Sequence, residues 1–420
     1  MAIPSITRVD AILLLGLAFF SSSVVHGIGE TVFDVTKHGA KPDGTTDNVE
    51  AFMQVWLAAC SSTAPAKVVV PAGTFFMGPA VFQGPCKVPI IFEVQGVVKG
   101  VVRATTDITE YTSEEWILFE TIDGLTLNGK GTLAKVMLSG NTLIASRTKN
   151  VCGSPAVLNV VSFTSLQSIK LRKVNNGVVH DISSLNSKNF HFHVTDCTNL
   201  TLHSLNITAL GNSPNTDGIH ISTSKLVNVT RSVIGTGDDC ISIGHGAFNI
   251  TISQIFCGPG HGISVGSLGK YKVEQDVMGI LVSNCTLSNT TYGARIKSYA
   301  QSDPSQASNI IYQDIIMDSV HNPIIIDQTY GSGEKSKQTQ EPSQSQVKIS
   351  DVHFKNIKGT SASDVAVTFL CSAKDPCEGV ELLDIDLAFN GAARSKTLSS
   401  SCVNAKFTTG GKQNPPPCPP

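Results

Sequence analysis

Short segments in which apolar and polar residues alternate follow one another along most of the chain after residue 60. In the middle of the chain, the segments IHIS, ISIG and ISVG begin at Ile219, Ile241 and Ile263, so they recur every 22 residues. Such alternation is typical of half-buried strands, and a fixed period is typical of a solenoid. A β-propeller is the main alternative, but its blades repeat at about 40 residues or more. The pattern therefore predicts an all-β chain folded as a parallel β-helix.

One segment near the N-terminus has helical periodicity instead. Apolar residues between Phe52 and Ala59 fall on one face at helical spacing, and Asp47 followed three residues later by Glu50 has the pattern of a capping box. A stack of β coils needs a cover for its first coil. We therefore expect a short N-terminal capping helix.

Composition narrows the fold and the partners. Apolar residues make up 41% of the 420 residues and aromatic residues only 6%, which suits a core of stacked aliphatic strands. The formal net charge of -2 disfavours nucleic acid as a partner, and an anionic substrate would have to be met by a few local cations. We expect one β-helix domain over residues 28–410 and an irregular Pro-rich tail over residues 411–420.

The first residues have the composition of a secretion signal. The apolar run Ala11–Phe20 is too short to span a bilayer, and small residues precede a cleavage site near Gly27. We expect residues 1–27 to be a signal peptide, and the mature chain to be secreted, extracellular and free of membrane segments. A buried N-terminal element is the alternative.

Cysteines and glycosylation motifs fit an oxidising compartment. The chain has eleven cysteines, so disulfides are expected with at least one thiol left over, and Cys418 could tether the tail to Cys402. Asn-x-Ser/Thr motifs predict a glycoprotein, although some of these asparagines could instead serve turns. The motifs lie at Asn199, Asn206, Asn228, Asn249, Asn284 and Asn289.

Acidic residues share the period of the strands. Asp217, Asp239 and His261 are spaced by 22 residues, and Asp238 is next to Asp239. Because stacked coils are about 4.8 Å apart, these side chains should gather at one edge of one face. Paired carboxyl groups can act as acid and base in glycoside hydrolysis. Simple turn chemistry is the alternative explanation of each motif taken alone.

Two cations follow on what should be the same face. Arg295 and Lys297 are two residues apart on a predicted strand and so point to the same side. They suit an anionic sugar, although an ordinary solvated strand face is the alternative. Tyr330, one coil further on, could stack on a sugar. His245 lies beyond the strand that follows Asp239, so we expect it to take no part.

These motifs resemble those of a known family. NTD (215–217), GDD (237–239), GHG (260–262) and RIK (295–297) occur in this order in the polygalacturonases of glycoside hydrolase family 28. The segments GPGHGISVGSLGKY, DGTTD and NPIIIDQ look most like the plant, pollen-type exopolygalacturonases. The resemblance implies a right-handed parallel β-helix of the pectin-lyase-like type. It also implies exo-acting, inverting hydrolysis of α-1,4-linked galacturonan in the cell wall by a monomer that uses no cofactor or metal.

The resemblance also assigns roles. Asp238 is expected to be the general acid, with Asp217 and Asp239 holding and activating the water and His261 supporting the acid. Arg295 and Lys297 would bind the substrate carboxylate. Asn215 and Tyr330 would line the sugar sites.

Two departures keep other functions open. Gly331 stands where the family pattern has a cysteine, so a local disulfide near Tyr330 is expected to be missing, and the segment 134–160 fits the family poorly. A catalytically weakened wall-binding protein and a pectate or pectin lyase on the same fold are the alternatives. Carboxylates on adjacent coils could also be only about 5 Å apart, a separation associated with retention rather than inversion.

Overall fold

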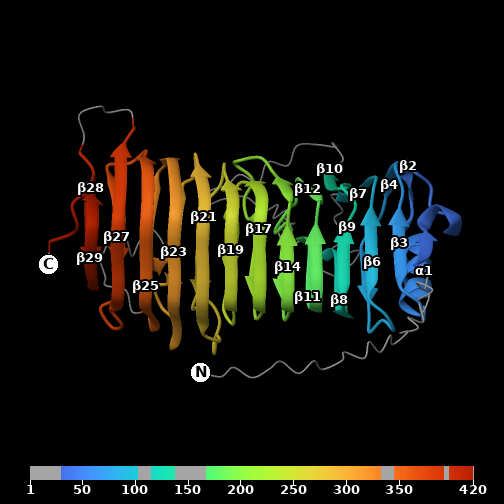
Figure 1. Ribbon diagram of the computed structural model, residues 1–420, viewed down its shortest axis with the longest axis horizontal. Coiled ribbons are helices and arrows are strands. Elements are labelled where there is room, and N and C mark those ends of the chain that lie inside the picture. Colours follow the sequence, from blue (N-terminus) through green and yellow to red (C-terminus); the bar gives the residue numbers. More distant parts are fainter. Residues whose placement is uncertain (1–29, 103–114, 138–166, 333–344, 392–396, 420) are drawn as a thin grey trace, which may run out of the picture.

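The computed structural model describes residues 30–102, 115–137, 167–332, 345–391 and 397–419. Within these residues the chain winds into a parallel β-helix, in which every paired strand is parallel to its neighbours and one helix closes the N-terminal end (Figure 1). The coil is right-handed, as the crossover between parallel strands favours. The predicted fold class and its capping helix are therefore confirmed.

Strand pairing divides the coil into three faces, which we call sheets A, B and C. Sheet A consists of β5 (Ala80–Gln83), β8 (Glu115–Asp123), the first part of β11 (Gln167–His180), β13 (Phe192–Thr195), β16 (Ile219–Ser222), β18 (Ile241–Ile243), β20 (Ile263–Leu268), β22 (Tyr292–Tyr299), β24 (Asn322–Tyr330), β26 (Val365–Leu370) and β28 (Ser399–Val403).

Sheets B and C share the longer strands, which bend from one face into the next. Sheet B starts with β1 (Thr31–Asp34), β3 (Ala66–Val70), β6 (Ile90–Val94), β9 (Leu125–Asn128), the second part of β11 and β14 (Thr198–His203), and it ends with β29 (Ala405–Asn414). Sheet C starts with β2 (Asp43–Asp47), β4 (Thr74–Phe76), β7 (Val97–Val102), β10 (Thr132–Met137), β12 (Ser183–Leu185) and β15 (Asn206–Thr208). Both faces are continued by β17 (Lys225–Gly235), β19 (Phe248–Cys257), β21 (Val277–Ser288), β23 (Ser305–Val320), β25 (Val347–Ser361) and β27 (Cys377–Phe389).

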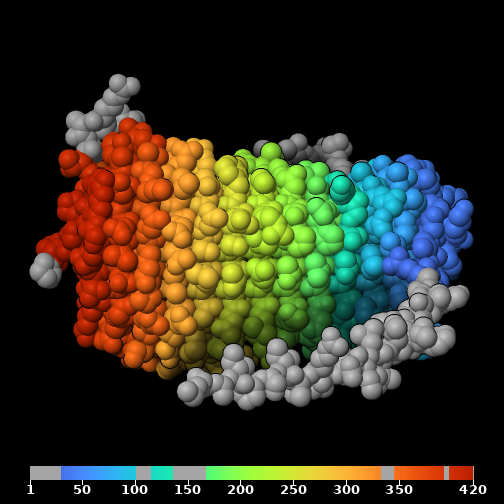
Figure 2. Space-filling model, viewed as in Figure 1, coloured from blue at the N-terminus to red at the C-terminus, as the bar shows by residue number. Residues whose placement is uncertain are grey.

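The core is a stack of aliphatic columns. Ile219, Ile241 and Ile263 pair in register and are fully or almost fully buried, and Ala294 and Ile324 continue the column on the next coils. The space-filling view shows the coils as successive bands from the N-terminal to the C-terminal end (Figure 2). The 22-residue period therefore corresponds to one coil per repeat in this stretch.

The helix α1 (Val49–Cys60) and the short 3-10 helix η1 (Val35–His38) cover the first coil. Trp56 is fully buried and packs against Phe82, with ring centroids 5.3 Å apart. The predicted capping box is wrong, because Asn48 is the N-cap residue and its side chain makes no capping bond. Asp47 instead accepts hydrogen bonds at Oδ1 from the backbone of Val49 and of Gly78, each 3.1 Å long.

Asparagines with positive φ turn many of the corners. Four of the glycosylation-motif asparagines adopt this left-handed conformation, which Asn tolerates better than most residues: Asn199, Asn249, Asn284 and Asn289. Asn199 also donates from Nδ2 to Oδ1 of Asn176 on the preceding coil, over 2.7 Å. These asparagines therefore have a turn-forming role whether or not they carry a glycan.

Disulfides reinforce both ends and the middle of the stack. The predicted bond between Cys402 and Cys418 is present, along with Cys60–Cys86, Cys240–Cys257 and Cys371–Cys377. Cys197 and Cys285 are free thiols buried in the core. The irregular tail predicted from residue 411 is wrong for residues 411–414, because β29 reaches Asn414 and pairs there with β27. Among the described residues, no helix is long and apolar enough to cross a bilayer.

Candidate active site

The repeat places three predicted site residues on consecutive coils of sheet A. Asp217 lies two residues before β16, Asp239 two residues before β18, and His261 two residues before β20. These strands pair in register at Ile219, Ile241 and Ile263. The predicted stacking of the motifs is therefore confirmed.

Each of the two aligned acids accepts a hydrogen bond from a serine on the following coil. Ser242 Oγ donates to Oδ2 of Asp217 over 2.6 Å, and Ser264 Oγ donates to Oδ1 of Asp239 over 2.7 Å. Ser242 and Ser264 are themselves paired in register and almost fully buried. Sequence reasoning missed both serines, although each follows its acid by 25 residues, which is a signal in the repeat.

Lys297 contacts one of the aligned acids directly. Its Nζ donates to Oδ2 of Asp239 over 2.6 Å, and both side chains are buried, with 7% and 1% of their surface exposed. Burial opposes the charge of Lys297, but the charges of Asp239 and Asp217 outweigh it and raise the pKa of the ammonium group. Both oxygens of Asp239 thus accept from donors, as an ionised carboxylate does.

Asp217 is in a different electrostatic environment. Burial raises the pKa of Asp217 well above its usual value, and the negative charges of Asp239 and Asp238 raise it further. Lys297 and the hydroxyl of Ser242 act in the opposite direction. Asp217 therefore holds a proton more readily than an ordinary aspartate does.

Asp238 and His261 form a half-buried pair beside these acids. His261 Nδ1 is 2.9 Å from Oδ1 of Asp238, and the same oxygen accepts from the backbone N–H of Asp239 over 2.8 Å. Burial opposes ionisation of Asp238, but the bond to His261, the charges of His261 and Lys297 and this backbone bond outweigh it. The pKa of Asp238 therefore lies below its ordinary value.

Arg295 is buried between two tyrosines. Its Cζ lies 3.7 Å from the ring centroid of Tyr292 and 5.5 Å from that of Tyr330. Only 4% of Arg295 is exposed, and its Nε has no hydrogen-bond partner among the described residues. Tyr292, which also packs edge-on against His261, was missed from the sequence because it lies outside the recurring motifs.

Glycines near the acids allow neighbouring backbone segments to approach closely. Gly262 has φ +82°, and a Cβ there would lie 2.2 Å from the backbone oxygen of Tyr292. A Cβ on Gly237 would lie 2.0 Å from the backbone oxygen of Ser213. Neighbouring backbone therefore leaves no room for a side chain at Gly262 or Gly237.

The other predicted residues are at the margin of this cluster or outside it. Asn215 is exposed and has φ 55°, two residues before Asp217. His245 packs edge-on against Tyr271, with ring centroids 6.4 Å apart. No contact among the described residues joins His245 to the acids.

Asp238, Asp239 and His261 present ligand atoms within 4.8 Å of one another, a grouping that could hold a metal ion. A cation bound there would share Asp239 with the ammonium group of Lys297, which already occupies Oδ2 at 2.6 Å. Two cations bound to the same carboxylate repel each other. The donor set therefore fits a hydrogen-bonded acid cluster better than a metal site.

Comparison with known families identifies the chain. The model of the glycosyl hydrolases family 28 matches residues 60–411. The chain belongs to this family.

Several relatives of this family 28 protein are plant enzymes. It is 43% identical over 396 residues to "Exopolygalacturonase clone GBGE184" of Arabidopsis thaliana, covering 93% of this chain and 88% of the relative. It is 43% identical to an exopolygalacturonase of Platanus acerifolia over 92% of this chain and 97% of the relative. A polygalacturonase of Gossypium hirsutum is 42% identical over 99% of this chain and 97% of the relative.

Solved structures share the fold at lower identity. An exopolygalacturonase of Thermotoga maritima superposes with a TM-score of 0.72 at 18% identity, covering 91% of each chain. An endo-xylogalacturonan hydrolase of Aspergillus tubingensis gives 0.73 at 23% identity, covering 91% of this chain and all of the other. Since one of these names is exo and the other endo, the fold alone does not distinguish the two modes.

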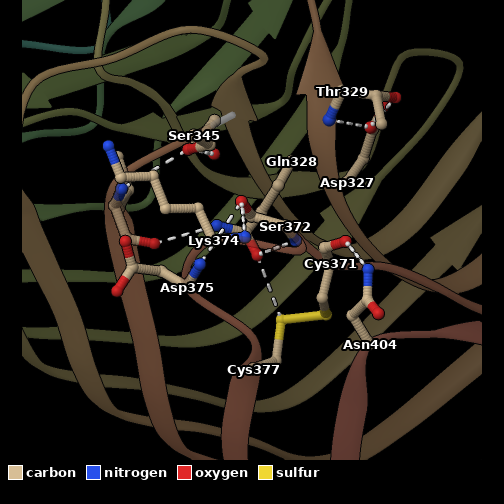
Figure 3. Close-up of a disulfide and its surroundings, with 12 residues drawn as sticks. Asp327, Gln328, Thr329, Ser345, Cys371, Ser372, Lys374, Asp375, Cys377 and Asn404 are labelled. Carbon is tan, nitrogen blue, oxygen red and sulfur yellow. Dashed lines mark hydrogen bonds between the residues drawn. A yellow bond between two sulfur atoms is a disulfide. The ribbon is translucent and has the colours of Figure 1, made fainter. Parts of the chain in front are cut away.

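The two departures from the family pattern have different outcomes. Near Gly331, where the sequence predicts a missing disulfide, the buried Gln328 fixes the strand that carries Tyr330 (Figure 3). Its Nε2 donates to the oxygen of Val347 and its Oε1 accepts from the backbone N–H of Ser372, both over 2.9 Å. Figure 3 shows this side chain beside the Cys371–Cys377 disulfide. The segment 134–160 lies mostly outside the described residues, which end at 137 there.

Proposed function

We propose that this family 28 hydrolase cleaves α-1,4 bonds of polygalacturonate and releases galacturonate from a chain end. The observation that supports this substrate best is Arg295, a buried guanidinium with an Nε that has no described partner. Arg295 pairs in register with Ser264, the residue that donates to Asp239. A planar guanidinium suits a uronate carboxylate. Lys297 is already bound to Asp239, so Arg295 is the better placed of the two predicted cations to bind a substrate anion. The names of the plant relatives point to the same substrate.

Asp238 is proposed as the general acid, with Asp217 and Asp239 activating the water and His261 orienting Asp238. The pKa of Asp238 is lowered in the free site, so the acid must gain its proton as the substrate binds. A uronate carboxylate arriving beside Asp238 supplies a negative charge, which disfavours the ionised form. Asn215 and Tyr330 are proposed to line the sugar sites, where the half-buried ring of Tyr330 lies beside Arg295.

Inversion is proposed from the family resemblance, and the stereochemistry of the product tests it. Oxygen atoms of Asp238 and Asp239 lie within 4.8 Å, closer than the roughly 6.5–9.5 Å usual between the carboxyl groups of inverting enzymes. Proton NMR of the first-formed product separates the mechanisms. A β anomer from the α-linked substrate supports inversion, whereas an α anomer rejects it.

Product sizing tests the substrate and the exo mode together. Polygalacturonate is incubated with the protein and the products are separated by size over time. Galacturonate as the sole early product supports exo action, whereas a ladder of oligomers supports endo action. Unsaturated products absorbing in the ultraviolet would indicate a lyase, and binding without products would indicate a wall-binding protein.

We also propose that the protein acts as a secreted, glycosylated monomer in the cell wall, without nucleic acid or membrane as a partner. The predicted signal peptide at residues 1–27 lies outside the described residues. Asn206, Asn249, Asn284 and Asn289 are exposed, which enzymatic glycan transfer requires. Mass spectrometry of the mature protein would establish the cleavage site and the occupied asparagines.

A further inference from the structure

A chain of hydrogen bonds runs from a histidine to Asp217. His220 Nδ1 is 2.8 Å from Ser242 Oγ, and Ser242 Oγ is 2.6 Å from Oδ2 of Asp217. A hydroxyl has one proton to donate. If Ser242 donates that proton to Asp217, its oxygen must accept the Nδ1–H of His220. With Asp217 ionised, the contacts therefore fix both the direction of the chain and the tautomer of the histidine.

The corresponding serine one coil later has a different environment. Ser264 donates to Oδ1 of Asp239, and Lys297 occupies the second oxygen. Ser264 pairs in register with Arg295, whereas Ser242 pairs with His220 on its other side. Oδ1 of Asp217 accepts no hydrogen bond from the described residues, so that oxygen is available to a water molecule.

His220 is itself held in place. The ring of Phe190 stacks on it, with centroids 4.6 Å apart and planes at 21°. Burial, followed by the charge of Lys297 and the proximity of His245, lowers the pKa of His220 to about 3. The imidazole therefore takes up no second proton in mildly acidic solution, and its Nδ1–H can keep donating to Ser242.

We propose that Ser242 and His220 are positioning residues of the hydrolase, which turn Asp217 so that Oδ1 faces the attacking water. This inference rests on the proposed function, in which Asp217 acts in its ionised form. Activity then falls as the pH falls through the pKa of Asp217. The charged or titratable groups facing Asp217 are Asp238, Asp239 and Lys297, with His220 behind Ser242.

Removing the hydroxyl of Ser242 should shift the pKa of Asp217 in a known direction. Ser242 stabilises the ionised form of Asp217, so Ser242→Ala should raise the pKa of Asp217 still further. The acidic limb of the kcat profile should move to higher pH by about one unit, as loss of one bond to a charged group implies. Ser253→Ala is the matched control, because Ser253 donates to Thr230 on sheet B, over 3.1 Å, away from the acids.

Variants of His220 test the second link. His220→Leu removes the donor to Ser242 and should lower kcat about tenfold with little change in KM. His220→Asn retains an N–H near the position of Nδ1 and should restore most of that loss. Equal effects of the two substitutions would show that the histidine only fills space, and would overturn its assignment.

A carbon-13 NMR titration separates this inference from the proposed function. The carboxyl signal of Asp217, assigned with Asp217→Asn, is followed against pH in the wild-type protein and in Ser242→Ala. A rise of about one unit in the pKa of Asp217 supports the positioning role of Ser242, even if the wild-type protein does not cleave polygalacturonate. An unchanged pKa of Asp217 overturns that role, even if galacturonate is released.

Discussion

The buried pair of Lys297 and Asp239 gives a prediction in which stability is measured apart from activity. Lys297→Met leaves an unpaired carboxylate and Asp239→Asn leaves an unpaired ammonium group, each where the wild-type contact is 2.6 Å long. Removing one partner of a buried ion pair costs about 3–5 kcal/mol. The double variant buries no unpaired charge at this point, and its asparagine can still accept from Ser264. It should therefore recover about 2–3 kcal/mol relative to the sum of the single changes.

The size of the effect can be expressed as a melting temperature. An unfolding entropy of about 2.1 cal/mol/K per residue gives about 0.9 kcal/mol/K for a chain of 420 residues. A loss of 4 kcal/mol then lowers Tm by about 4–5 °C. Thermal unfolding of the four proteins is followed by circular dichroism at one pH, with galacturonate release measured in parallel. All three variants should be inactive, and strictly additive losses of Tm would refute the coupling.

Three further changes test other parts of the site. Asp238→Asn should lower galacturonate release by about 10³-fold or more with Tm unchanged, because no general acid remains; retained activity would reject its role. Tyr292→Leu should raise KM about tenfold and leave kcat nearly constant, because Arg295 loses an aromatic contact of about 1–2 kcal/mol; an unchanged KM would contradict this. Gly262→Ala should cost more than about 3 kcal/mol through its positive φ and a clash with backbone, measured by Tm, whereas Gly211→Ala, where a Cβ meets nothing nearer than 3.4 Å, should cost little.

The sequence was sufficient to predict the fold and the grouping of the acids. The 22-residue recurrence fixes the register of β16, β18 and β20, and the register in turn fixes which residues share an edge. The sequence alone therefore places Asp217, Asp239 and His261 at one edge. A period specifies which coil and which face a residue occupies, and these three residues needed nothing more.

Contacts across coils were harder to predict. Lys297 was expected to face the substrate, but its long side chain reaches back 58 positions along the chain to Asp239. Register alone does not say where a flexible side chain ends. Tyr292 lies two residues before Ala294, the partner of Ile263, but follows His261 by 31 residues rather than 22, so the regular spacing did not mark it. The first helix was misassigned by one residue at its cap, since Asp47 and Asn48 are both suitable N-cap residues and only tertiary contacts distinguish them.

The hydrogen bonds that Ser242 and Ser264 make to acids on the preceding turns restrict how this protein can evolve. A solenoid generally tolerates the gain or loss of a whole turn, because each turn contacts only its neighbours. Here Asp217 depends on Ser242 from the next turn, and Asp239 depends on Ser264 from the turn after that and on Lys297 from the following one. Duplicating or deleting a single turn between residues 217 and 297 would leave a well-formed spiral with mismatched partners. Growth by duplication is thus restricted to the turns before and after this block.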